Sequence, residues 1–450
     1  PPEGDKGGGI SQIIEIFNGV HIQLKLKDTA FTVRTERAIL FRVMLSEDRN
    51  SSEEPLEELR RLAETAGANI VHTVVQNRVS IDPVYYIGKG KAVELSRLAK
   101  EMDVDVLICD DDLAPAQVKN LEKVIDEKVI DRSELILDIF ATRAKTFQAK
   151  LQVELAQLEY TKPRLKRMWT HLSRIEGGIG TRGPGEKQLE VDKRIIARKI
   201  HYLREKLHEI EKRQERLVAS RKEFFTVSIV GYTNAGKSTL MNALTEIDTF
   251  VEDKLFATLD TKTSVCKLEN GEKFLVSDTV GFIKKLPHHL VSSFKATLEE
   301  ARHADLLLHV VDTSSPAIHN QIEAVNTVLK ELGCDKKPTI LVFNKIDAVK
   351  EEAVIPLLRS RYKDCVMISA KTHQGTEDLK RKIMEMLERN FIDVELSCNV
   401  ANGKLIAYLH EHAHIVSSRF DDERATFRLL MEDKLLQKLR MLDDGIQIKE

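Results

Sequence analysis

The stretch Gly231–Leu240, GYTNAGKSTL, follows the apolar run TVSIV and precedes MNALTE. The apolar run predicts a buried strand, and the residues from Lys237 to Leu244 predict a helix. The segment between them matches the spacing G-x-x-x-x-G-K-[ST]. Glycines let backbone N–H groups close around phosphate oxygens, and the helix N-terminus adds partial positive charge. A turn that binds nothing is disfavoured by the strand and the helix on either side, so the sequence predicts a phosphate-binding loop.

The side chains of this loop have individual expected roles. We expect Lys237 to reach the β- and γ-phosphates and the Ser238 hydroxyl to bind Mg²⁺. The expected nucleotide contacts from the loop are Gly231, Tyr232, Thr233, Asn234, Ala235, Gly236, Lys237, Ser238 and Thr239. The Asn234 carboxamide has two interpretations. It can ligate K⁺ beside the phosphates and so supply positive charge to the transition state, or it can cap the loop by bonding to the backbone.

Three short motifs downstream each follow a predicted strand and indicate which base is bound. Asn344-Lys345-Ile346-Asp347 places a carboxylate that can accept from N1–H and the 2-amino group of guanine, a pairing that adenine does not offer. Ser369-Ala370-Lys371 is expected to close over the base. Asp278-Thr279-Val280-Gly281 has D-x-x-G spacing, so we expect Asp278 to hold Mg²⁺ and the Gly281 N–H to sense the γ-phosphate. Each motif is weak alone, but their order predicts GTP.

Length and composition limit the number of domains and the class of protein that contains these motifs. A chain of 450 residues predicts two to four domains, and 42% hydrophobic residues can form buried cores. The 5 cysteines lack C-x-x-C spacing and are typical of reduced thiols. No apolar run approaches the length of a membrane span, and the first residues lack a signal-peptide core. We therefore expect a soluble, cytoplasmic monomer that does not insert into a membrane.

Charge is distributed unevenly along the chain. The formal net charge is −2, yet residues 143–222 contain 21 Lys and Arg against 10 Asp and Glu. A basic block in an otherwise acidic chain is typical of a protein that binds a phosphate backbone. The alternative is an ordinary solvated helix surface, but such a surface would balance its signs. The block therefore favours a nucleic-acid partner.

The pattern within this block predicts two long helices packed antiparallel. The apolar residues at helical spacing are Leu151, Leu155 and Leu158, and then Ile196, Ile200, Leu203, Leu207, Ile210 and Leu217. The connection between them has five glycines and a proline within residues 177–185, which excludes a helix there. Arg174, Arg182 and Lys187 surround this tip. We expect these three residues to contact RNA, because a basic, glycine-rich loop suits a folded RNA surface.

The coarse pattern divides the chain into four parts. Strand-like and helix-like runs alternate in residues 1–140, which predicts a parallel α/β domain. The helical hairpin spans 141–222, a P-loop domain 223–390, and a small α+β domain with a helix from Glu432 to Leu442 spans 391–450. In the first part, Gly88 and Gly90 precede a predicted helix, so an anion can bind there, although G-x-G alone is a weak signal.

Several stretches together resemble the HflX family of ribosome-associated, translation-factor-like GTPases. They include YIGKGKAVEL, LAQLEYTKPRL, MWTHLSR, GGIGTRGPGEKQLEVDKR, GYTNAGKSTLMNALT, LFATLDTKT, DTVGFIKKLPHHLVSSFKATLEE and NKID. The resemblance covers nearly the whole chain. It implies an N-terminal βα domain with a long antiparallel helical hairpin, a Ras-like P-loop GTPase domain and a small C-terminal α+β domain. It also implies a GTPase that binds the large (50S) ribosomal subunit and splits, rescues or helps assemble ribosomes, particularly under stress.

The resemblance also implies further site residues. The switch I motif is matched by Phe256-Ala257-Thr258-Leu259-Asp260, so Thr258 is expected to complete the Mg²⁺ shell. Thr261 stands where relatives often have proline, which should stiffen this loop less. The family has been linked to ATP binding by its N-terminal half, and here only the GKGK stretch supports that partner.

The position after D-x-x-G predicts slow catalysis. Many related GTPases place a water-orienting glutamine there, but this chain has Phe282. We therefore expect Lys237, Asn234, Thr258 and Gly281 to form the catalytic set, with hydrolysis slow alone and stimulated by the ribosome. One alternative is an RNA-binding, GTP-dependent scaffold in ribosome biogenesis with little hydrolysis of its own. A metabolic ATPase or kinase is disfavoured by Asp347.

Overall fold

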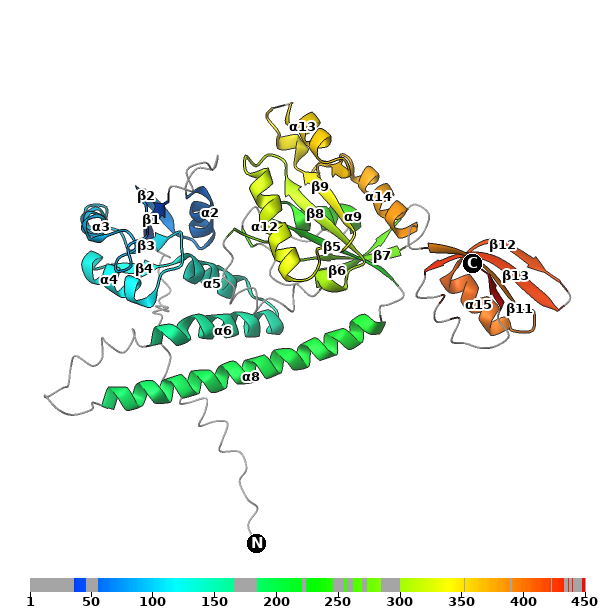
Figure 1. Cartoon of the computed structure of the whole chain (residues 1–450), viewed down its shortest axis with the longest axis horizontal. Helices are drawn as coiled ribbons and strands as arrows, with labels where there is room; N and C mark the ends of the chain where they lie inside the picture. The colour runs from blue at the N-terminus through cyan, green and yellow to red at the C-terminus, as the bar shows by residue number, and fades with distance from the viewer. Residues whose placement is uncertain are drawn as a thin grey trace, which may run out of the picture.

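The structure is a computed structural model, and three sheets joined by helices make up its described part (Figure 1). The described residues are 36–45, 56–165, 184–220, 224–245, 255–256, 262–268, 273–284, 300–351, 353–388, 391–421, 423–432, 436, 439 and 447–449. The predicted contacts Ala257–Asp260, Arg174 and Arg182 lie outside these ranges, as does the side chain of Lys187. None of the helices within the ranges is long and apolar enough to cross a membrane.

The first sheet is parallel, which confirms the α/β class predicted for this end of the chain. Its strand order is β2 (Asn69–Asn77), β1 (Arg37–Met44), β3 (Val106–Cys109), β4 (Lys128–Ile130). The helices between and after these strands are α2 (Glu57–Thr65), α3 (Lys89–Glu101), α4 (Pro115–Ile125) and α5 (Arg132–Arg143). Because successive strand side chains point to opposite faces, Ala38 and Leu40 of β1 share a buried cluster with α2 and α5. Ile39 and Phe41 share another cluster with α3 and α4.

Two helices extend this domain. Helix α6 (Phe147–Thr161) ends in the short helix η2 (Lys162–Arg164), and α8 (Pro184–Ser220) lies beside α6 (Figure 1). The residues buried in the α6–α8 seam are Leu151, Leu155, Leu165, Ile196, Ile200, Leu203 and Leu207. The opposite face of α6 packs onto α5 through Ala149, Val153 and Ala156. Helix α6 is therefore held on both sides, whereas α8 has only one buried face along its described side chains.

The second sheet has six strands and contains the predicted motifs. Its order is β10 (Cys365–Met367), β9 (Thr339–Asn344), β8 (Leu306–Asp312), β5 (Phe225–Gly231), β7 (Lys273–Asp278), β6 (Lys262–Lys267). All neighbours are parallel except β6 and β7. Its helices are α9 (Lys237–Thr245), α12 (Ile318–Glu331), the short η3 (Ile346–Ala348), α13 (Val354–Arg361) and α14 (Thr376–Glu388). The carboxyl ends of β5, β7, β8 and β9 meet at one edge, and the motifs lie there.

The third sheet is antiparallel, in the order β12 (His414–Phe420), β13 (Arg424–Glu432), β11 (Phe391–Asn399), β14 (Gln447–Lys449). Helix α15 (Gly403–His412) covers one face, with Leu405 and Leu409 in the core. The runs FIDVELSCNV and RATFRLLM are strand-like in sequence and correspond to β11 and β13, whereas β12 and β14 were not predicted. In β12 the apolar alternation is interrupted at Ser417 and Ser418, beside a register shift. The predicted start of a helix at Glu432 is wrong, because this residue ends strand β13.

Candidate functional site

The turn between β5 and α9 is kept hollow by two glycines. A Cβ at Gly231 would overlap the carbonyl oxygen of Val310 on the neighbouring strand. Gly236 has a φ of +89°, and a Cβ there would overlap the side-chain amide of Asn344. Any side chain at either position would therefore require its neighbours to move. The predicted phosphate-binding loop thus has the open backbone that an anion needs.

Lys237 is buried inside this loop. Its Nζ donates to the carbonyl oxygens of Tyr232 at 2.8 Å and Gly231 at 3.2 Å. Burial lowers the pKa of Lys237, Asp278 opposes this shift and the charge on Lys345 adds to it, and the resulting pKa is about 8. A buried ammonium that meets only neutral carbonyls is poorly compensated. An anionic oxygen in the loop would compensate it far better, since charge-assisted hydrogen bonds are the strong ones.

Ser238 and Asp278 converge at the start of α9. The Ser238 hydroxyl donates to Oδ2 of Asp278 at 2.6 Å, and Asp278 is buried at the end of β7. A hydroxyl and a carboxylate are both hard oxygen donors of the kind that Mg²⁺ prefers. This pair therefore fits the expected metal. The third expected ligand, Thr258, lies outside the described residues.

The D-x-x-G segment is joined to the loop by backbone hydrogen bonds. The Thr233 N–H donates to the carbonyl of Phe282 at 2.7 Å, and the Phe282 N–H donates to the carbonyl of Gly231 at 3.1 Å. A Cβ at Gly281 would lie 2.8 Å from the Cα of Thr233 and 3.0 Å from Nζ of Lys237. Gly281 thus lies against the buried lysine. The Phe282 ring is buried in an apolar cluster and cannot orient water.

Asn344 joins the two sides of the expected nucleotide site. Its Nδ2 donates to the carbonyl of Ala235 at 2.9 Å, and its Oδ1 accepts from the N–H of Ala370 at 2.9 Å. Lys345, with a left-handed φ of 63°, pairs with Asp312 at 2.7 Å. One buried side chain therefore connects the phosphate loop with the segment expected to close over the base.

The remaining expected contacts lie around the same edge. Asp347 is in η3 and is exposed, as is Lys371, whereas Ser369 is fully buried and accepts at Oγ from the Thr372 N–H at 3.2 Å. Thr279 is buried and donates to the carbonyl of Ile229. Ile346 and Val280 contribute apolar packing. The Asp347 carboxylate therefore stands at the surface, where a base can reach it.

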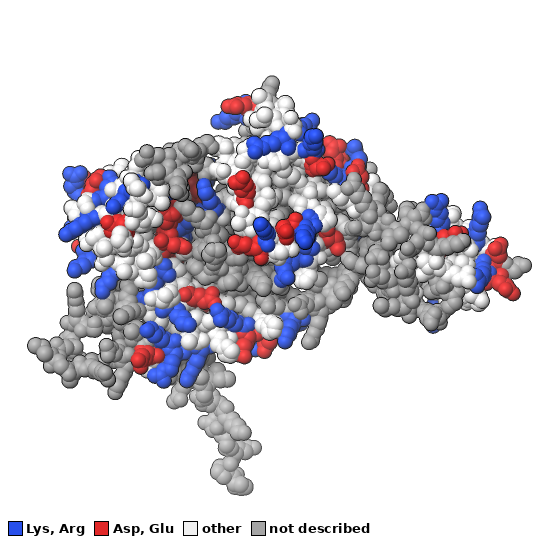
Figure 2. All heavy atoms as spheres, in the orientation of Figure 1, with Lys and Arg blue, Asp and Glu red and all other residues white. Residues whose placement is uncertain are grey.

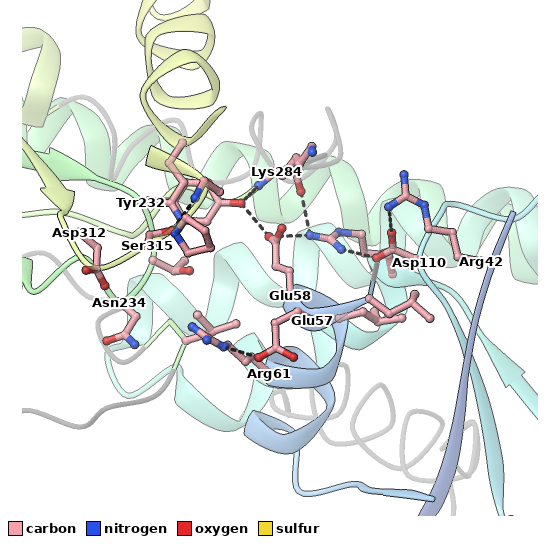
Figure 3. Close-up of a pocket in the computed structure, with 18 of the residues that line it drawn as sticks. Arg42, Glu57, Glu58, Arg61, Asp110, Tyr232, Asn234, Lys284, Asp312 and Ser315 are labelled. Carbon is pink, nitrogen blue, oxygen red and sulfur yellow. Dashed lines mark hydrogen bonds and ion pairs between the residues drawn. The ribbon is translucent and has the colours of Figure 1, made fainter. Parts of the chain in front are cut away.

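A pocket of about 340 Å³ lies between α2 of the first domain and the phosphate loop (Figure 3). Oε1 of Glu58 accepts from the Tyr232 hydroxyl at 2.8 Å and from Arg132 at 2.8 Å. The Tyr232 hydroxyl in turn accepts from the N–H of Lys284 at 2.7 Å, and Arg132 also donates to the Lys284 carbonyl at 3.0 Å. Arg132 is anchored on Asp110 at 2.7 Å. The first domain therefore holds both the phosphate loop and the segment after D-x-x-G.

The segment before the predicted switch I threonine also contacts the first domain. Phe256 has a φ of 54°, is buried, and meets Phe140 of α5 edge-on with ring centroids 4.6 Å apart. The ring of Phe256 therefore packs against the neighbouring domain. The same apolar cluster includes Leu59 of α2 and Phe282.

Glu58, Arg132 and Phe140 were not predicted from the sequence. They lie in helices whose local pattern is that of ordinary amphipathic helices. The contacts of Glu58 with Arg132 and Tyr232, and of Arg132 with Lys284, join residues that are 74 to 174 positions apart in sequence. Arg132 is a charged residue that is only 3% exposed, which the structure alone shows. Lys, Glu, Arg and Asp are almost never fully buried unless paired.

The glycine pair of the first domain lies at the start of α3. Gly88 is the N-cap with a φ of 79°, and no side chain caps this helix. The Arg78 guanidinium lies so close that a Cβ at Gly88 would overlap it. The helix N-terminus thus has a cation beside it.

The glycine loop with its buried lysine, the hydroxyl–carboxylate pair and the Asn344 link together define a P-loop GTPase. The family description "GTP-binding GTPase N-terminal" matches residues 53–141, "GTP-binding GTPase Middle Region" residues 143–221, and "50S ribosome-binding GTPase" residues 226–345. The GTPase HflX of Caldanaerobacter subterraneus subsp. tengcongensis is 43% identical over 90% of this chain and 93% of its own length. That of Escherichia coli (strain K12) is 43% identical over 82% and 87%.

This chain belongs to the HflX family of GTPases, and it hydrolyses GTP. Among solved structures, a GTP-binding protein from Sulfolobus solfataricus in complex with GDP is 26% identical, covers 79% of this chain and 99% of its own, and has a TM-score of 0.42. The resemblance found in the sequence motifs is confirmed.

Proposed function

We propose that GTP binds at the carboxyl edge of the second sheet with its phosphates in the loop Gly231–Thr239. The observation that supports this most is the placement of a buried lysine and Gly281 around one hollow loop. Lys237 would exchange its carbonyl partners for β- and γ-phosphate oxygens. Ser238, Asp278 and Thr258 would hold Mg²⁺, which when bound neutralises charge on the phosphate oxygens.

We propose that the base is guanine, recognised by Asn344, Asp347 and the segment Ser369–Lys371. Asp347 is exposed, so its substitution should change recognition without disturbing the fold. Asp347→Asn should exchange the preference for guanine for one for xanthine, whose 2-oxo group accepts from a carboxamide. The measurement is the affinity for GDP, XDP and ADP of the wild type and the variant. Equal affinity of the wild type for ADP and GDP would overturn the assignment.

We propose K⁺ as a ligand of Asn234. The Asn234 backbone is left-handed, with a φ of 59°, and among the described residues its carboxamide makes no hydrogen bond. Loop capping therefore finds no support in this part of the chain. A cation there would lie beside the phosphates. Turnover of the wild type in K⁺ should exceed that in Na⁺, and Asn234→Ala should remove the difference; equal rates in both salts would exclude the cation.

We propose that the basic hairpin binds rRNA of the large ribosomal subunit and that the chain splits, rescues or helps assemble ribosomes. The exposed basic residues on the described part of α8 are Lys193, Arg194, Arg198, Arg204, Lys212 and Arg213. Figure 2 shows Lys and Arg gathered along this helix. Cations on one exposed helix suit a phosphate backbone, and binding should then weaken steeply with salt.

The ribosomal proposal is tested by GTP turnover with and without large subunits. The intact protein should be stimulated, because Phe282 leaves the isolated site without a water-orienting glutamine. A protein lacking residues 177–185 should bind nucleotide normally but respond less. No stimulation of the intact protein would favour the alternative, an RNA-binding scaffold with little hydrolysis of its own. Equal stimulation of both proteins would show that the tip is not the sensor.

We propose ATP as a ligand of the α3 N-terminus. The uncapped helix start at Gly88 and the neighbouring Arg78 would offer N–H groups and a guanidinium to a phosphate. ATP binding should survive Lys237→Ala, which disables the other nucleotide site, and should be lost in Arg78→Ala. Binding that disappears with Lys237→Ala would place ATP in the GTPase domain instead.

A further inference from the structure

Helix α2 is fixed against the phosphate loop by one of its faces. Glu58 on this face accepts from the hydroxyl of Tyr232, a residue of the loop itself, and from Arg132. Residues three apart lie on the same face of a helix, so Arg61 follows Glu58 one turn further along. Arg61 lines the same pocket as Asn234, and Figure 3 shows both side chains at this pocket. The first domain thus presents a guanidinium near the mouth of the loop.

Arg61 is held differently from the other arginines of the pocket. Arg132 and Arg42 both pair with the buried carboxylate of Asp110, at 2.7 Å and 3.4 Å. Arg61 donates to Glu57 at 3.1 Å, and these side chains are 58% and 41% exposed. An exposed ion pair within one helix contributes little. The Arg61 guanidinium can therefore change partner at small cost, whereas those of Arg42 and Arg132 cannot.

GTP hydrolysis needs positive charge beside the γ-phosphate. In GTP hydrolysis a water oxygen forms a bond to the γ-phosphorus while the bond to the β–γ bridging oxygen breaks. The electron pair of the broken bond stays on GDP, and the protons of the water pass to inorganic phosphate and solvent. Negative charge therefore grows on the leaving oxygen. An arginine supplied from the same chain stabilises such charge in other GTPases.

We propose that Arg61 is a catalytic residue for GTP hydrolysis, supplied to the GTPase domain by the first domain. On GTP binding its guanidinium leaves Glu57 and donates to the γ-phosphate and the leaving oxygen. This role rests on the proposed placement of the phosphates in the loop. With this role, the first domain contributes a catalytic group to a site in which Phe282 cannot orient the attacking water.

Three variants of the full chain and one reference variant test this role. Arg61→Ala removes the guanidinium, Arg61→Lys keeps the charge, and Arg60→Ala is the matched control. Arg60 is the neighbouring arginine of α2, is 39% exposed, pairs with the same Glu57 at 3.9 Å, and lies outside the pocket lining. Lys237→Ala reports separately on the phosphate site. The measurements are single-turnover hydrolysis, affinity for GDP, and affinity for GDP with aluminium fluoride, which resembles the transition state.

Arg61→Ala should slow hydrolysis by about 10³-fold and weaken binding of the aluminium fluoride complex similarly, with GDP affinity unchanged within about twofold. Arg61→Lys should recover part of the loss, and Arg60→Ala should match the wild type. Wild-type hydrolysis by Arg61→Ala, or an equal loss in Arg60→Ala, would overturn the role. A loss of GDP affinity as large as the loss of rate would show that Arg61 acts in binding, not catalysis. Unchanged GDP binding by Lys237→Ala would overturn the phosphate site and this role with it.

Discussion

The carboxyl ends of parallel strands in the first two sheets lie on opposite sides of the interdomain pocket, and their polar groups are bound in different ways. After β5 the chain turns through glycines and leaves a hollow around Lys237. After β3 it supplies carboxylates that are already bound by side chains: Asp110 by Arg132, and Asp111 by the Tyr86 hydroxyl. Ligands of parallel sheets bind at such edges. The edge after β5 is therefore the one whose polar groups are left for a ligand to compensate.

We call the carboxyl edge of the first sheet, with Asp110, Asp111 and Asp131, the filled edge, and the edge of the second sheet around Lys237 the hollow edge. The filled edge has a structural role. Its Asp131 accepts from the hydroxyl of Tyr160 at 2.9 Å and pairs with Arg164 at 3.1 Å, and it caps the start of α5. Arg132 is the next residue, so this rigid network determines where its guanidinium points. That guanidinium holds Glu58 and the carbonyl of Lys284. Through Arg132, the filled edge therefore holds the segments that surround the hollow edge in place.

The largest effect is expected from removing the charge in the hollow edge. Lys237→Ala should cost on the order of several kcal/mol in transition-state stabilisation, because the phosphates lose their buried cation. The thermal stability of the nucleotide-free protein should not fall, since the charge of Lys237 is poorly compensated there. Turnover and thermal unfolding of the same preparation check both statements. Wild-type turnover would show that the hollow edge is not the site.

The next effect is expected from breaking the filled edge. Arg132→Met keeps the length of the side chain but removes the buried cation that pairs with Asp110 and Glu58, at a cost of about 3–5 kcal/mol in unfolding free energy. Release of GDP should also accelerate, because the Lys284 carbonyl loses its donor. Chemical denaturation and GDP dissociation rates measure these changes. The matched control is Arg60→Met, at an exposed position, and a cost as large there would contradict the explanation.

The unfolding free energy should also depend on pH through His309, a residue of the sheet that forms the hollow edge. His309 lies in β8 of the second sheet, and burial, assisted by the charge on Lys237, lowers its pKa to about 4. Between this value and the ordinary pKa of about 6.5, only the unfolded chain binds the proton. The contribution of His309 is thus complete above pH 6.5 and is lost as the pH falls toward 4. About 2 kcal/mol should be lost between pH 7.5 and 5.

The variant that isolates this contribution is His309→Gln. Its unfolding free energy should fall less over the same pH interval than that of the wild type, measured by chemical denaturation at each pH. Parallel pH profiles of the two proteins would mean that His309 is not buried in its neutral form.

The smallest effect on stability is expected from a substitution of Tyr232, whose hydroxyl joins the two domains. Tyr232→Phe removes one hydroxyl that donates to Glu58 and accepts from the Lys284 N–H, which should cost about 1–2 kcal/mol. Tyr202→Phe, on the exposed surface of α8, is the control and should be neutral. Thermal unfolding compares the two. Equal behaviour of the two variants would mean that the hydroxyl contributes nothing to the domain contact.

The hollow edge could be predicted from sequence because its chemistry is local. Gly231, Gly236, Lys237 and Ser238 fall within eight residues at fixed spacing between a strand and a helix, so the chain itself shows the site. The parallel α/β class of the first domain was predicted from the alternation of strand-like and helix-like runs in the same way. The second role of Asn344, which bonds to Ala235 and Ala370, was not visible, since those contacts depend on how three loops meet.

The filled edge could not be predicted because its contacts are distant in sequence. Arg132 reaches Lys284 across 152 residues, and neither residue belongs to a recognisable pattern. In the third sheet, β12 was missed for a different reason. Its two central serines and the register shift remove the alternation that marks a half-buried strand. Local spacing therefore identifies a binding loop, whereas an interdomain contact is determined only by the assembled fold.

Helix α8 is much longer than the seam that holds it. Its 37 residues correspond to about 55 Å, and among the side chains that the structure describes the buried residues of α8 in the seam lie between Ile196 and Leu207. The twelve residues from Pro184 to Ile195 extend about 18 Å beyond the first residue of this seam. A rotation of about 10° at the seam would therefore carry the end at Pro184 through about 3 Å. A small change in side-chain packing at the seam would therefore displace the far end of the helix by a distance of atomic dimensions.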